Sequence, residues 1–430
     1  MRALRFLTGL AIEPFGDPVS SAQLGVEELG LAVSRALLQA GVQPEPGSPE
    51  AIPARGELVL LPDTQFITRA AVRAFLAAAP AAPGIYRLAL RRGPASEYAR
   101  PLQRVDEDPA TDSVQQDVYL ARGDLGALRT TGDWEALRDA LRARARPVVL
   151  DPGAQVEELP EVRPGPPRTT LALPRTLLLA ADVRHWVHLV WLNHMLPWVR
   201  LQEHWQDHPL QARLRTLGCP DPRRHPARLA VLGRGCDVHP TALVEGSILG
   251  EGVTVGAFAS VRECILGDGV EVGSHTHFKR CVVGAGCHTL NDSYFIGDTC
   301  YPGSTLANIM LRNSVIGRRV FLTTGVTLRD DGLAGPVSVV QAGREVPTGR
   351  WVLGGCAGHR SLLGARALLE PGRAVPNRTV IMLRPEEAVS KVPADAEPRR
   401  PYTYFESTLL PVEQAYPGWN PPEVDPEARR

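Results

Sequence analysis

Apolar residues recur at short, regular intervals through the second half of the chain, and this periodicity constrains the fold more than any other feature. The intervals from Leu232 onward are 6, 6, 5, 6, 6, 5, 6, 6, 5, 6 and 6 residues, so that three units span 17 residues and the 17-residue period itself repeats. The residues of this column are Leu232, Val238, Val244, Leu249, Val255, Val261, Leu266, Val272, Phe278, Val283, Thr289 and Phe295. A fixed short period is typical of a solenoid, in which each coil packs on its neighbours.

A second column of small or β-branched side chains supports the same register. Its members lie two residues before those of the first column and are Cys236, Ala242, Ser247, Val253, Ala259, Cys264, Val270, Thr276, Cys281, Cys287 and Ser293. Because residues two apart in an extended chain share a face, both columns are predicted to point into the coil. The cysteines of this column are therefore interpreted as packing residues.

Glycine follows many of the larger residues, which predicts sharp corners between short strands. Six examples are Gly233, Gly250, Gly256, Gly267, Gly273 and Gly284. We expect a positive φ at these positions, because glycine tolerates it at no steric cost. The pattern weakens after Phe295 and resumes at Ile316. A loop between Leu328 and Leu353, too long for a corner, precedes a last repetitive stretch that ends at Ile381.

These repeats resemble the hexapeptide repeats of the left-handed parallel β-helix in acyltransferases and sugar-nucleotide enzymes. The segments VGSHTHFKRCVVGAGCHTLNDSYFIGD and PGSTLANIMLRN are similar to segments of the bifunctional N-acetylglucosamine-1-phosphate uridyltransferase/glucosamine-1-phosphate acetyltransferase family. The resemblance covers about residues 230–385. It implies a left-handed β-helix, a homotrimer, and acyl transfer from acyl-CoA to a sugar phosphate or nucleotide sugar.

The first half of the chain alternates between strand-like and helix-like segments, an order typical of an α/β domain with a parallel sheet. Asp63 directly follows the apolar strand Leu58–Leu61, at the edge where such sheets place ligands. This element resembles the metal-binding element of nucleotidyltransferases, which implies a Rossmann-like fold with Asp63 as a Mg²⁺ ligand. The alternative for Asp63 is a loop carboxylate or a helix N-cap. Trp191 and Asn193 are similar to residues of the helix that leads into the β-helix in that superfamily.

The glycine-rich signature of nucleotidyltransferases is altered in this chain. The corresponding stretch reads LTGLAIEPFGDPVSSAQLGVEELG, in which Gly9 and Gly16 have a different spacing. Glu27 and Glu28 occupy the region where the family has a lysine, and carboxylates there would repel a triphosphate. The sequence therefore predicts a shortened nucleotidyltransferase-like domain that has lost catalysis.

An acyl-transfer site needs a general base, and the histidine of the resembling family aligns with Asp292 in this chain. His275 lies one 17-residue coil earlier, so the two side chains are predicted to stack about 4.8 Å apart on the outer face and form a catalytic pair. The residues expected to bind substrate are Lys279, Tyr294 and Asn308. The resemblance places Lys279 on an element that contacts substrate phosphate. The alternative is a polar cluster at a trimer interface.

The expected organisation is an α/β domain over residues 1–170, a helical linker over 171–225, a left-handed β-helix over 226–385 and a proline-rich tail over 386–430.

The chain has 47 basic and 47 acidic residues, which argues against nucleic acid as a partner. No stretch is predicted to insert into a membrane, since charged residues interrupt the most apolar region. Seven cysteines without a CxxC pair favour a reducing compartment and a cytoplasmic protein. The histidines of the linker helix are expected to pack rather than to bind metal.

Three interpretations of function remain open. The leading one is a sugar-phosphate nucleotidylyltransferase/acyltransferase homologue that uses acyl-CoA, with His275 as the base and Asp292 orienting it. A second is a catalytically inactive scaffold or regulatory subunit that senses a sugar nucleotide. The third is Mg²⁺-dependent nucleotidyl transfer to a sugar 1-phosphate, through a divergent loop and Asp63.

Overall fold

The computed structural model describes residues 1–129, 132–161, 169–217, 226–307, 309–332, 335–382, 402–405 and 408–417 of the 430-residue chain. The chain divides into two compact units, Met1–Val380 and Ile381–Arg430. In the second unit, β41 (Tyr402–Phe405) and β42 (Thr408–Pro411) form an antiparallel hairpin, which the short helix α7 (Val412–Ala415) follows. The four-segment division expected from the sequence stays a prediction.

A mixed sheet forms one part of the first unit. Its strands in spatial order are β12 (Ala145–Leu150), β9 (Gly84–Arg91), β11 (Ser113–Asp124), β7 (Arg55–Pro62), β1 (Arg2–Phe6) and β6 (Gln43–Pro46), and β10 (Asp106–Asp108) pairs with β11. Strand β1 is parallel to β6 and β7, but β11 is antiparallel to both β7 and β9. The expectation of a parallel sheet is therefore wrong at this central strand. The segment between β9 and β11 holds β10 and one helix, the four-residue α3 (Pro94–Glu97), which is too short for a parallel crossover.

Helices cover both faces of this sheet. On one face lie α1 (Leu29–Gln39) and α2 (Arg69–Ala78), and on the other lies α4 (Trp134–Arg142). The two faces follow from the alternation of side chains along a strand: Val59 packs with α1 and α2, whereas Leu58 and Leu60 pack with α4. This confirms the alternation of helices and strands predicted for the first half of the chain.

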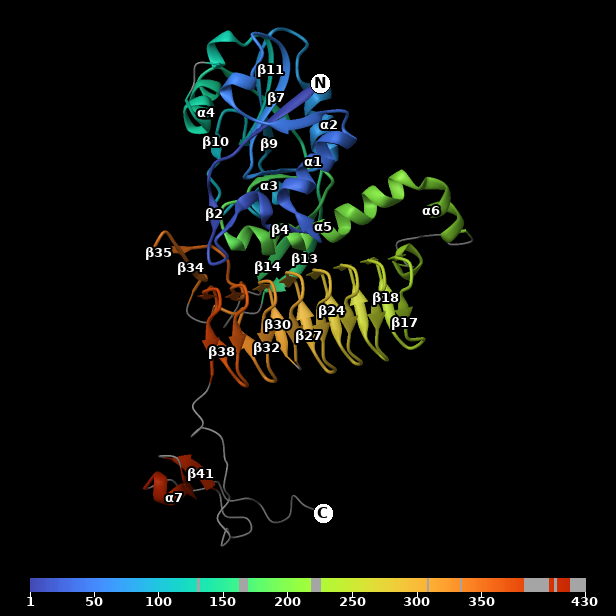
Figure 1. Cartoon of the computed structure of the whole chain (residues 1–430), viewed down its shortest axis with the longest axis vertical. Coiled ribbons are helices and arrows are strands. Elements are labelled where there is room, and N and C mark those ends of the chain that lie inside the picture. The colour runs from blue at the N-terminus through green and yellow to red at the C-terminus, as the bar shows by residue number, and fades with distance from the viewer. Residues whose placement is uncertain are drawn as a thin grey trace. The chain divides into compact units, whose positions relative to one another are not determined.

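The second part of the unit is a row of coils, whose strands form three parallel sheets (Figure 1). The first face consists of β16 (Val231–Leu232), β19 (Ile248–Leu249), β22 (Ile265–Leu266), β25 (Val282–Val283), β28 (Thr299–Cys300), β31 (Val315–Ile316), β36 (Cys356–Ala357) and β39 (Ala374–Val375). The second face consists of β17 (Asp237–Val238), β20 (Thr254–Val255), β23 (Glu271–Val272), β26 (His288–Thr289), β29 (Thr305–Leu306), β32 (Phe321–Leu322), β37 (Leu362–Leu363) and β40 (Val380–Ile381). The third face consists of β18 (Leu243–Glu245), β21 (Ser260–Arg262), β24 (His277–Lys279), β27 (Tyr294–Ile296), β30 (Met310–Arg312), β33 (Thr327–Leu328) and β38 (Leu368–Leu369). Three parallel sheets of this kind fit a left-handed β-helix.

The strand pairing confirms the 17-residue register. Successive partners along the first face are Leu232, Leu249, Leu266 and Val283. Inside the coils, the rings of Phe278 and Phe295 stack with centroids 4.5 Å apart. The weakening expected after Phe295 is wrong, because Phe295 pairs with Leu311 and the column continues through a coil that is one residue shorter. The long loop predicted after Leu328 contains an antiparallel hairpin of β34 (Ser338–Gln341) and β35 (Arg344–Pro347).

The corner glycines occur for a different reason from the one expected. None of the six glycines that follow large inward residues has a positive φ. Instead, a Cβ built on any of them would lie 2.3–2.6 Å from an atom of the next coil, as at Gly267, where the nearest atom is the backbone nitrogen of Ala285. Positive φ occurs two residues later, for example at Gly269 (φ +63°). Each such corner therefore has a glycine where the next coil approaches closely and, two residues later, a residue with positive φ that makes the turn.

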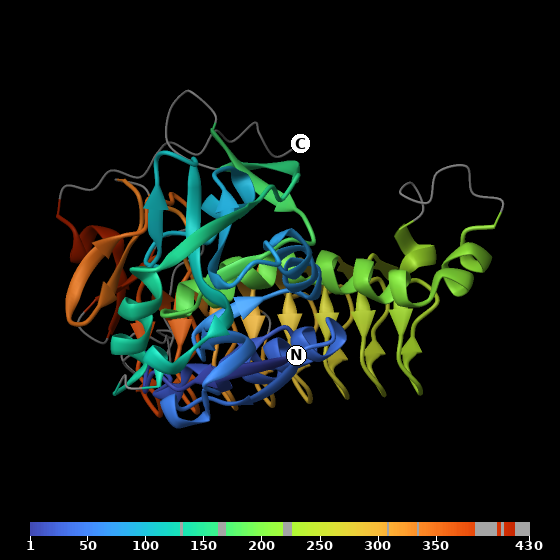
Figure 2. The same ribbon diagram turned by 90° about the horizontal axis from the view of Figure 1, so that it is seen from above.

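Helix α5 (Trp186–Asp207) connects the two parts and runs along the row of coils (Figure 1 and Figure 2). It contacts β28 and β31 of the first face, and its apolar side chains belong to one continuous cluster that includes residues of the mixed sheet and of the coils. Helix α6 (Pro209–Arg215) follows it. None of the described helices is long and apolar enough to cross a membrane.

Four short strand pairs complete the described part of the first unit. They are β2 (Ala11–Ile12) with β3 (Asp17–Pro18), β4 (Gln23–Leu24) with β5 (Glu27–Glu28), β8 (Gln65–Ile67) with β15 (Ala180–Asp182), and β13 (Gln155–Glu161) with β14 (Thr169–Arg175). The first two pairs contain the altered glycine-rich segment, and the last pair lies beside the third face of the coils.

Candidate functional site

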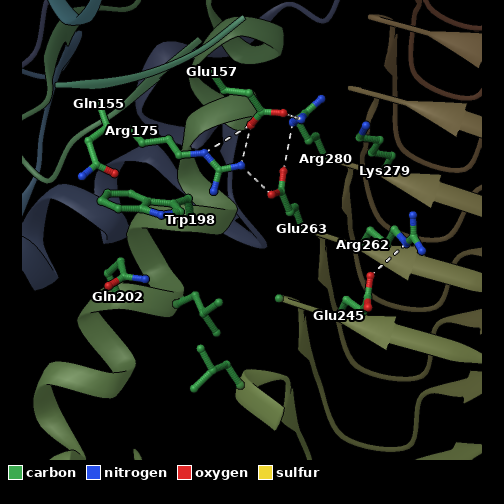
Figure 3. Close-up of a pocket in the computed structure, with 13 residues that line it drawn as sticks. Gln155, Glu157, Arg175, Trp198, Gln202, Glu245, Arg262, Glu263, Lys279 and Arg280 are labelled. Atoms are coloured by element: carbon green, nitrogen blue, oxygen red, sulfur yellow. Dashed lines mark hydrogen bonds and ion pairs between the residues drawn. The ribbon is translucent and has the colours of Figure 1, made fainter. Parts of the chain in front are cut away.

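A cavity of about 490 Å³ lies where the β13–β14 hairpin and α5 meet the third face of the coils (Figure 3). The hairpin supplies Glu157 and Arg175, and α5 supplies Trp198 and Gln202. Residues from successive coils form the opposite wall, namely Glu245, Arg262, Glu263, Lys279 and Arg280. The cavity therefore combines charged side chains with an apolar surface formed by Trp198, Leu201 and Leu229.

Two arginines and two glutamates form a closed network at the inner end of this cavity (Figure 3). Arg175 pairs with Glu157 and donates to Glu263 over 2.6 Å, and Arg280 pairs with the same two carboxylates. Burial acts to raise the pKa of Glu157, but the two arginines outweigh it and lower that pKa below its ordinary value. The network therefore holds the hairpin against the coils and leaves little net charge of its own.

Lys279 is the uncompensated cation of the cavity wall. Arg262, one coil earlier, pairs with Glu245 at 3.0 Å. In the part of the chain that the structure describes, no hydrogen bond or ion pair engages the ammonium group of Lys279. An unpaired ammonium group on the wall of a polar cavity can bind an anionic group such as a phosphate. The predicted phosphate contact of Lys279 stays a prediction, but the position suits it.

His277 lies two residues before Lys279 on the same outward side of β24. Its half-buried imidazole stacks on the ring of Tyr294 in the next coil, with centroids 4.8 Å apart and planes 14° apart. Burial and the nearby Arg262 and Lys279 lower the pKa of His277, which favours the neutral imidazole at pH 7. A neutral imidazole can accept a proton from a nucleophile.

The expected pair of His275 and Asp292 does not form. Both residues occupy equivalent corners with φ of +59°, so the one-coil offset is as predicted. However, the His275 ring stacks on Phe258, with centroids 5.2 Å apart, and no hydrogen bond or ion pair joins it to Asp292 among the described residues. The reason is that both residues lie at outward corners, where the ring of Phe258 in the preceding coil packs against the imidazole of His275. Asn308 lies outside the described residues.

Asp63 serves as a loop carboxylate. It is buried at the end of β7, and its Oδ1 accepts hydrogen bonds from the hydroxyl (2.7 Å) and the backbone nitrogen (3.1 Å) of Thr8. No group of three His, Cys, Asp or Glu side chains that could hold a metal occurs within the described ranges. These residues do not fit Mg²⁺ coordination, which normally uses several oxygen ligands.

In the segment that corresponds to the glycine-rich signature, Gly9 and Gly16 are exposed, whereas Gln23–Gly25 is buried against α5 and the coils. The backbone nitrogen of Gly25 donates to Asn193 over 2.7 Å, and that of Gln23 donates to the hydroxyl of Tyr301 over 2.9 Å. Glu27 pairs with Arg200 of α5 at 3.1 Å. The backbone nitrogens of Gln23 and Gly25 are therefore engaged by the protein itself. The loss of catalysis in the first half of the chain stays a prediction.

Two histidines of α5, His188 and His194, pack inside the protein, as expected. His188 is fully buried, and its Nε2–H donates to the carbonyl oxygen of Pro101 over 2.8 Å. His194 donates to the carbonyl oxygen of Gly297 over 2.9 Å and accepts from the hydroxyl of Tyr98 over 2.8 Å. Burial lowers the pKa of His188 to about 3 and that of His194 to about 4.

The sequence interpretation missed most of the cavity wall. The signal was available, because Glu245, Arg262 and Lys279 are spaced by 17 residues and so form an outward column of the same register. The partners from the hairpin, Glu157 and Arg175, carried no such signal, since the hairpin lies far away in the sequence.

Residues 219–300 match the family model described as GlmU-like, C-terminal hexapeptide. The match spans the coils that carry the cavity wall and none of the mixed sheet. No curated protein matches the chain. A GlmU-like hexapeptide domain is thus present, and it supports an acyltransferase-like function at the level of the family.

Proposed function

We propose that the coils transfer an acyl group from acyl-CoA to an amine or hydroxyl of a sugar phosphate or nucleotide sugar. The observation that carries the proposal is the outward pair on β24, in which a neutral imidazole and an unpaired ammonium group lie two residues apart. Residues two apart on a strand are separated by about 7 Å, a distance that a sugar phosphate can bridge. The GlmU-like match makes this chemistry the expected one for such coils.

In the proposed reaction, His277 takes the proton from the acceptor amine or hydroxyl as that atom attacks the thioester carbonyl carbon. A new C–N or C–O bond forms, the C–S bond breaks, and the imidazolium returns the proton to the departing thiolate. Lys279 holds the phosphate of the acceptor. The stacked ring of Tyr294 fixes the plane of the imidazole. A catalytic role of His275 with Asp292 is the competing assignment of the base.

We also propose that the working form is a homotrimer, with acyl-CoA bound along the third face. Large side chains on this face are exposed, among them Tyr294 (41%), Met310 (50%) and Leu368 (60%). A GlmU-like hexapeptide domain typically trimerises, and a row of exposed apolar side chains suits burial against a second chain.

The two candidate bases are distinguished by matched variants. With acetyl-CoA and a panel of amino-sugar phosphates, free thiol release is measured for the wild type, His277→Gln and His275→Gln. We expect kcat to fall at least about 100-fold in His277→Gln and to change less than about threefold in His275→Gln. The opposite pattern assigns the base to His275, and thiol release equal in both variants and the wild type contradicts histidine catalysis.

Lys279→Met tests the phosphate contact. The assay is run at pH 8, where the imidazole of His277 is neutral with or without the nearby charge of Lys279. KM for a phosphorylated acceptor is then expected to rise about tenfold or more, with kcat for the unphosphorylated sugar unchanged. Equal effects on both acceptors contradict a role of Lys279 in phosphate binding.

A binding protein without catalysis is the second candidate, and it is favoured by the buried Gln23–Gly25 stretch, in which the nitrogens of Gln23 and Gly25 are engaged by Tyr301 and Asn193. In that case nucleotide sugars bind, as measured by calorimetry, but no thiol release accompanies them in the presence of acetyl-CoA. We propose no step through Mg²⁺, because the surroundings of Asp63 do not fit the metal.

A further inference from the structure

At the corner between the first and second faces, the residue at the turn position differs between the early and the late coils. The residue with positive φ at this corner is glycine in the first five coils and arginine in the last three. The column reads Gly235, Gly252, Gly269, Gly286, Gly303, Arg319, Arg360 and Arg378. We call its last three members the arginine column.

The fold does not explain the arginine column. A left-handed backbone disfavours any residue with a Cβ relative to glycine, and the earlier coils make the same corner with glycine. The three side chains are exposed, and within the described ranges none of them makes a side-chain hydrogen bond or ion pair. Arg280 differs, since it occupies another left-handed corner (φ +55°) and binds two carboxylates there. Arg366 is also exposed and left-handed, but it lies alone at its corner, whereas three such arginines in one column, without a partner in the described ranges, point to a partner outside the protein.

The arginine column lines a cavity of about 410 Å³. The remaining lining residues are Arg318, His359 and Asn377 from the coils and Phe15 and Asp17 from the N-terminal segment. Four arginines thus face one carboxylate, in a protein whose formal charge is zero overall. The cavity is strongly cationic on a molecule whose basic and acidic residues are equal in number overall.

The single carboxylate is already neutralised by residues outside the arginine column. Asp17 pairs with the guanidinium of Arg318 and accepts from Nε2 of His359 at 3.0 Å. Nδ1 of His359 accepts from the backbone nitrogen of Arg318, so the imidazole is neutral with its proton on Nε2. Phe15 stacks on that imidazole, with ring centroids 4.7 Å apart. The floor of the cavity is therefore fixed, and the three charges of the arginine column remain uncompensated.

We propose that this cavity binds a diphosphate group, as free pyrophosphate or as part of a nucleoside diphosphate. Successive coils place the backbones of the three arginines about 4.8 Å apart, so that the arginine column extends over about 10 Å, more than one phosphate can occupy. Guanidinium groups bind phosphate oxygens in a bidentate manner. The cavity volume falls in the range of about 300–1,000 Å³ that is usual for small-ligand sites. The site is separate from the acyl-transfer pair and does not depend on it.

Calorimetric titration of the full chain in 150 mM salt tests the proposal with three probes: pyrophosphate, uridine diphosphate and inorganic phosphate. We expect pyrophosphate or uridine diphosphate to bind at least about tenfold more tightly than phosphate, because they engage more than one arginine. Tighter binding of uridine diphosphate identifies a nucleotide as the source of the group, and tighter binding of pyrophosphate identifies the free anion. Equal affinity for all three probes, or no binding, overturns the proposal.

Arg360→Gly restores the residue of the earlier coils and is the decisive variant. Binding of the preferred probe is expected to weaken about tenfold or more, while the melting temperature stays the same or rises, since glycine suits the left-handed corner. Arg366→Gly is the matched control, because Arg366 is an exposed left-handed arginine (φ +63°) at a different corner. Unchanged binding in Arg360→Gly, equal loss in Arg366→Gly, or a lower melting temperature of Arg360→Gly overturns the assignment.

Discussion

At the scale of single residues, two kinds of glycine shape the corners of the coils. Gly267 has no room for a side chain, since a Cβ would lie 2.6 Å from the backbone nitrogen of Ala285. Gly269 has a φ of +63° and open space around it, so that nothing lies within 4 Å of an added Cβ. The first glycine is required by coil-to-coil contact and the second by backbone conformation.

These two requirements predict different costs for the same substitution. Gly269→Ala is expected to lower the free energy of unfolding by about 1 kcal/mol, the cost of a left-handed alanine. Gly267→Ala is expected to cost about 2 kcal/mol or more, because the backbones of two coils must separate. Denaturant unfolding of both variants measures the difference, and a larger loss in Gly269→Ala contradicts the interpretation of the corners.

At the scale of elements, α5 joins the mixed sheet to the coils through buried polar groups. The side-chain amide of Asn193 accepts from the backbone nitrogen of Gly25 over 2.7 Å and donates to the hydroxyl of Thr299 over 3.0 Å. One residue of the helix therefore connects the N-terminal segment to the first face. The buried His188 and His194 connect the same helix to two loops.

Asn193→Ala is expected to destabilise the protein by about 2–3 kcal/mol, because it leaves buried polar groups on both sides without a partner. Gln206→Ala on the exposed side of α5 is the control and is expected to change stability by less than about 0.5 kcal/mol. Equal effects of the two substitutions in urea unfolding would show that the amide does not connect the segments.

The buried histidines of α5 predict a loss of stability in acid. Their pKa values in the folded protein, about 3 for His188 and about 4 for His194, lie below the ordinary value of 6.5. Between these values the unfolded chain binds more protons than the folded one, so stability is full above pH 6.5 and falls as the pH decreases toward 4. Each histidine accounts for about 2 kcal/mol between pH 8 and pH 5.

Urea unfolding between pH 5 and pH 8 measures this dependence. In His194→Gln the slope of the free energy of unfolding against pH is expected to decrease, because about one proton fewer is taken up on unfolding. An unchanged slope in the variant would mean that His194 does not titrate on unfolding.

At the scale of the whole molecule, the coils were predictable from the sequence and much of their surroundings was not. The spacing from Leu232 to Phe295 fixes the inward columns, because each coil repeats the packing of the last. The same spacing placed Lys279 above Arg262, yet it did not reveal Glu157, which comes from a distant hairpin. It placed His275 between Phe258 and Asp292, one coil away from each, but it could not show that the imidazole stacks on Phe258 and does not pair with Asp292.

The proposed assembly is a whole-molecule property with a direct measurement. A homotrimer has three times the chain mass of 46.6 kDa, which light scattering after gel filtration determines. Met310→Glu places a charge on the exposed row of the third face and is expected to reduce the mass to that of one chain. A wild-type protein with the mass of one chain contradicts the trimer.

The central claim is that the coils carry the chemistry while the mixed sheet has lost it. The most direct measurement follows two products in one wild-type preparation: free thiol from acetyl-CoA with amino-sugar phosphates, and pyrophosphate from nucleoside triphosphates with sugar 1-phosphates and Mg²⁺. The account predicts release of thiol and none of pyrophosphate. Release of pyrophosphate without thiol would contradict it, because the Gly9–Glu28 segment, with its altered signature, would then have to bind a triphosphate.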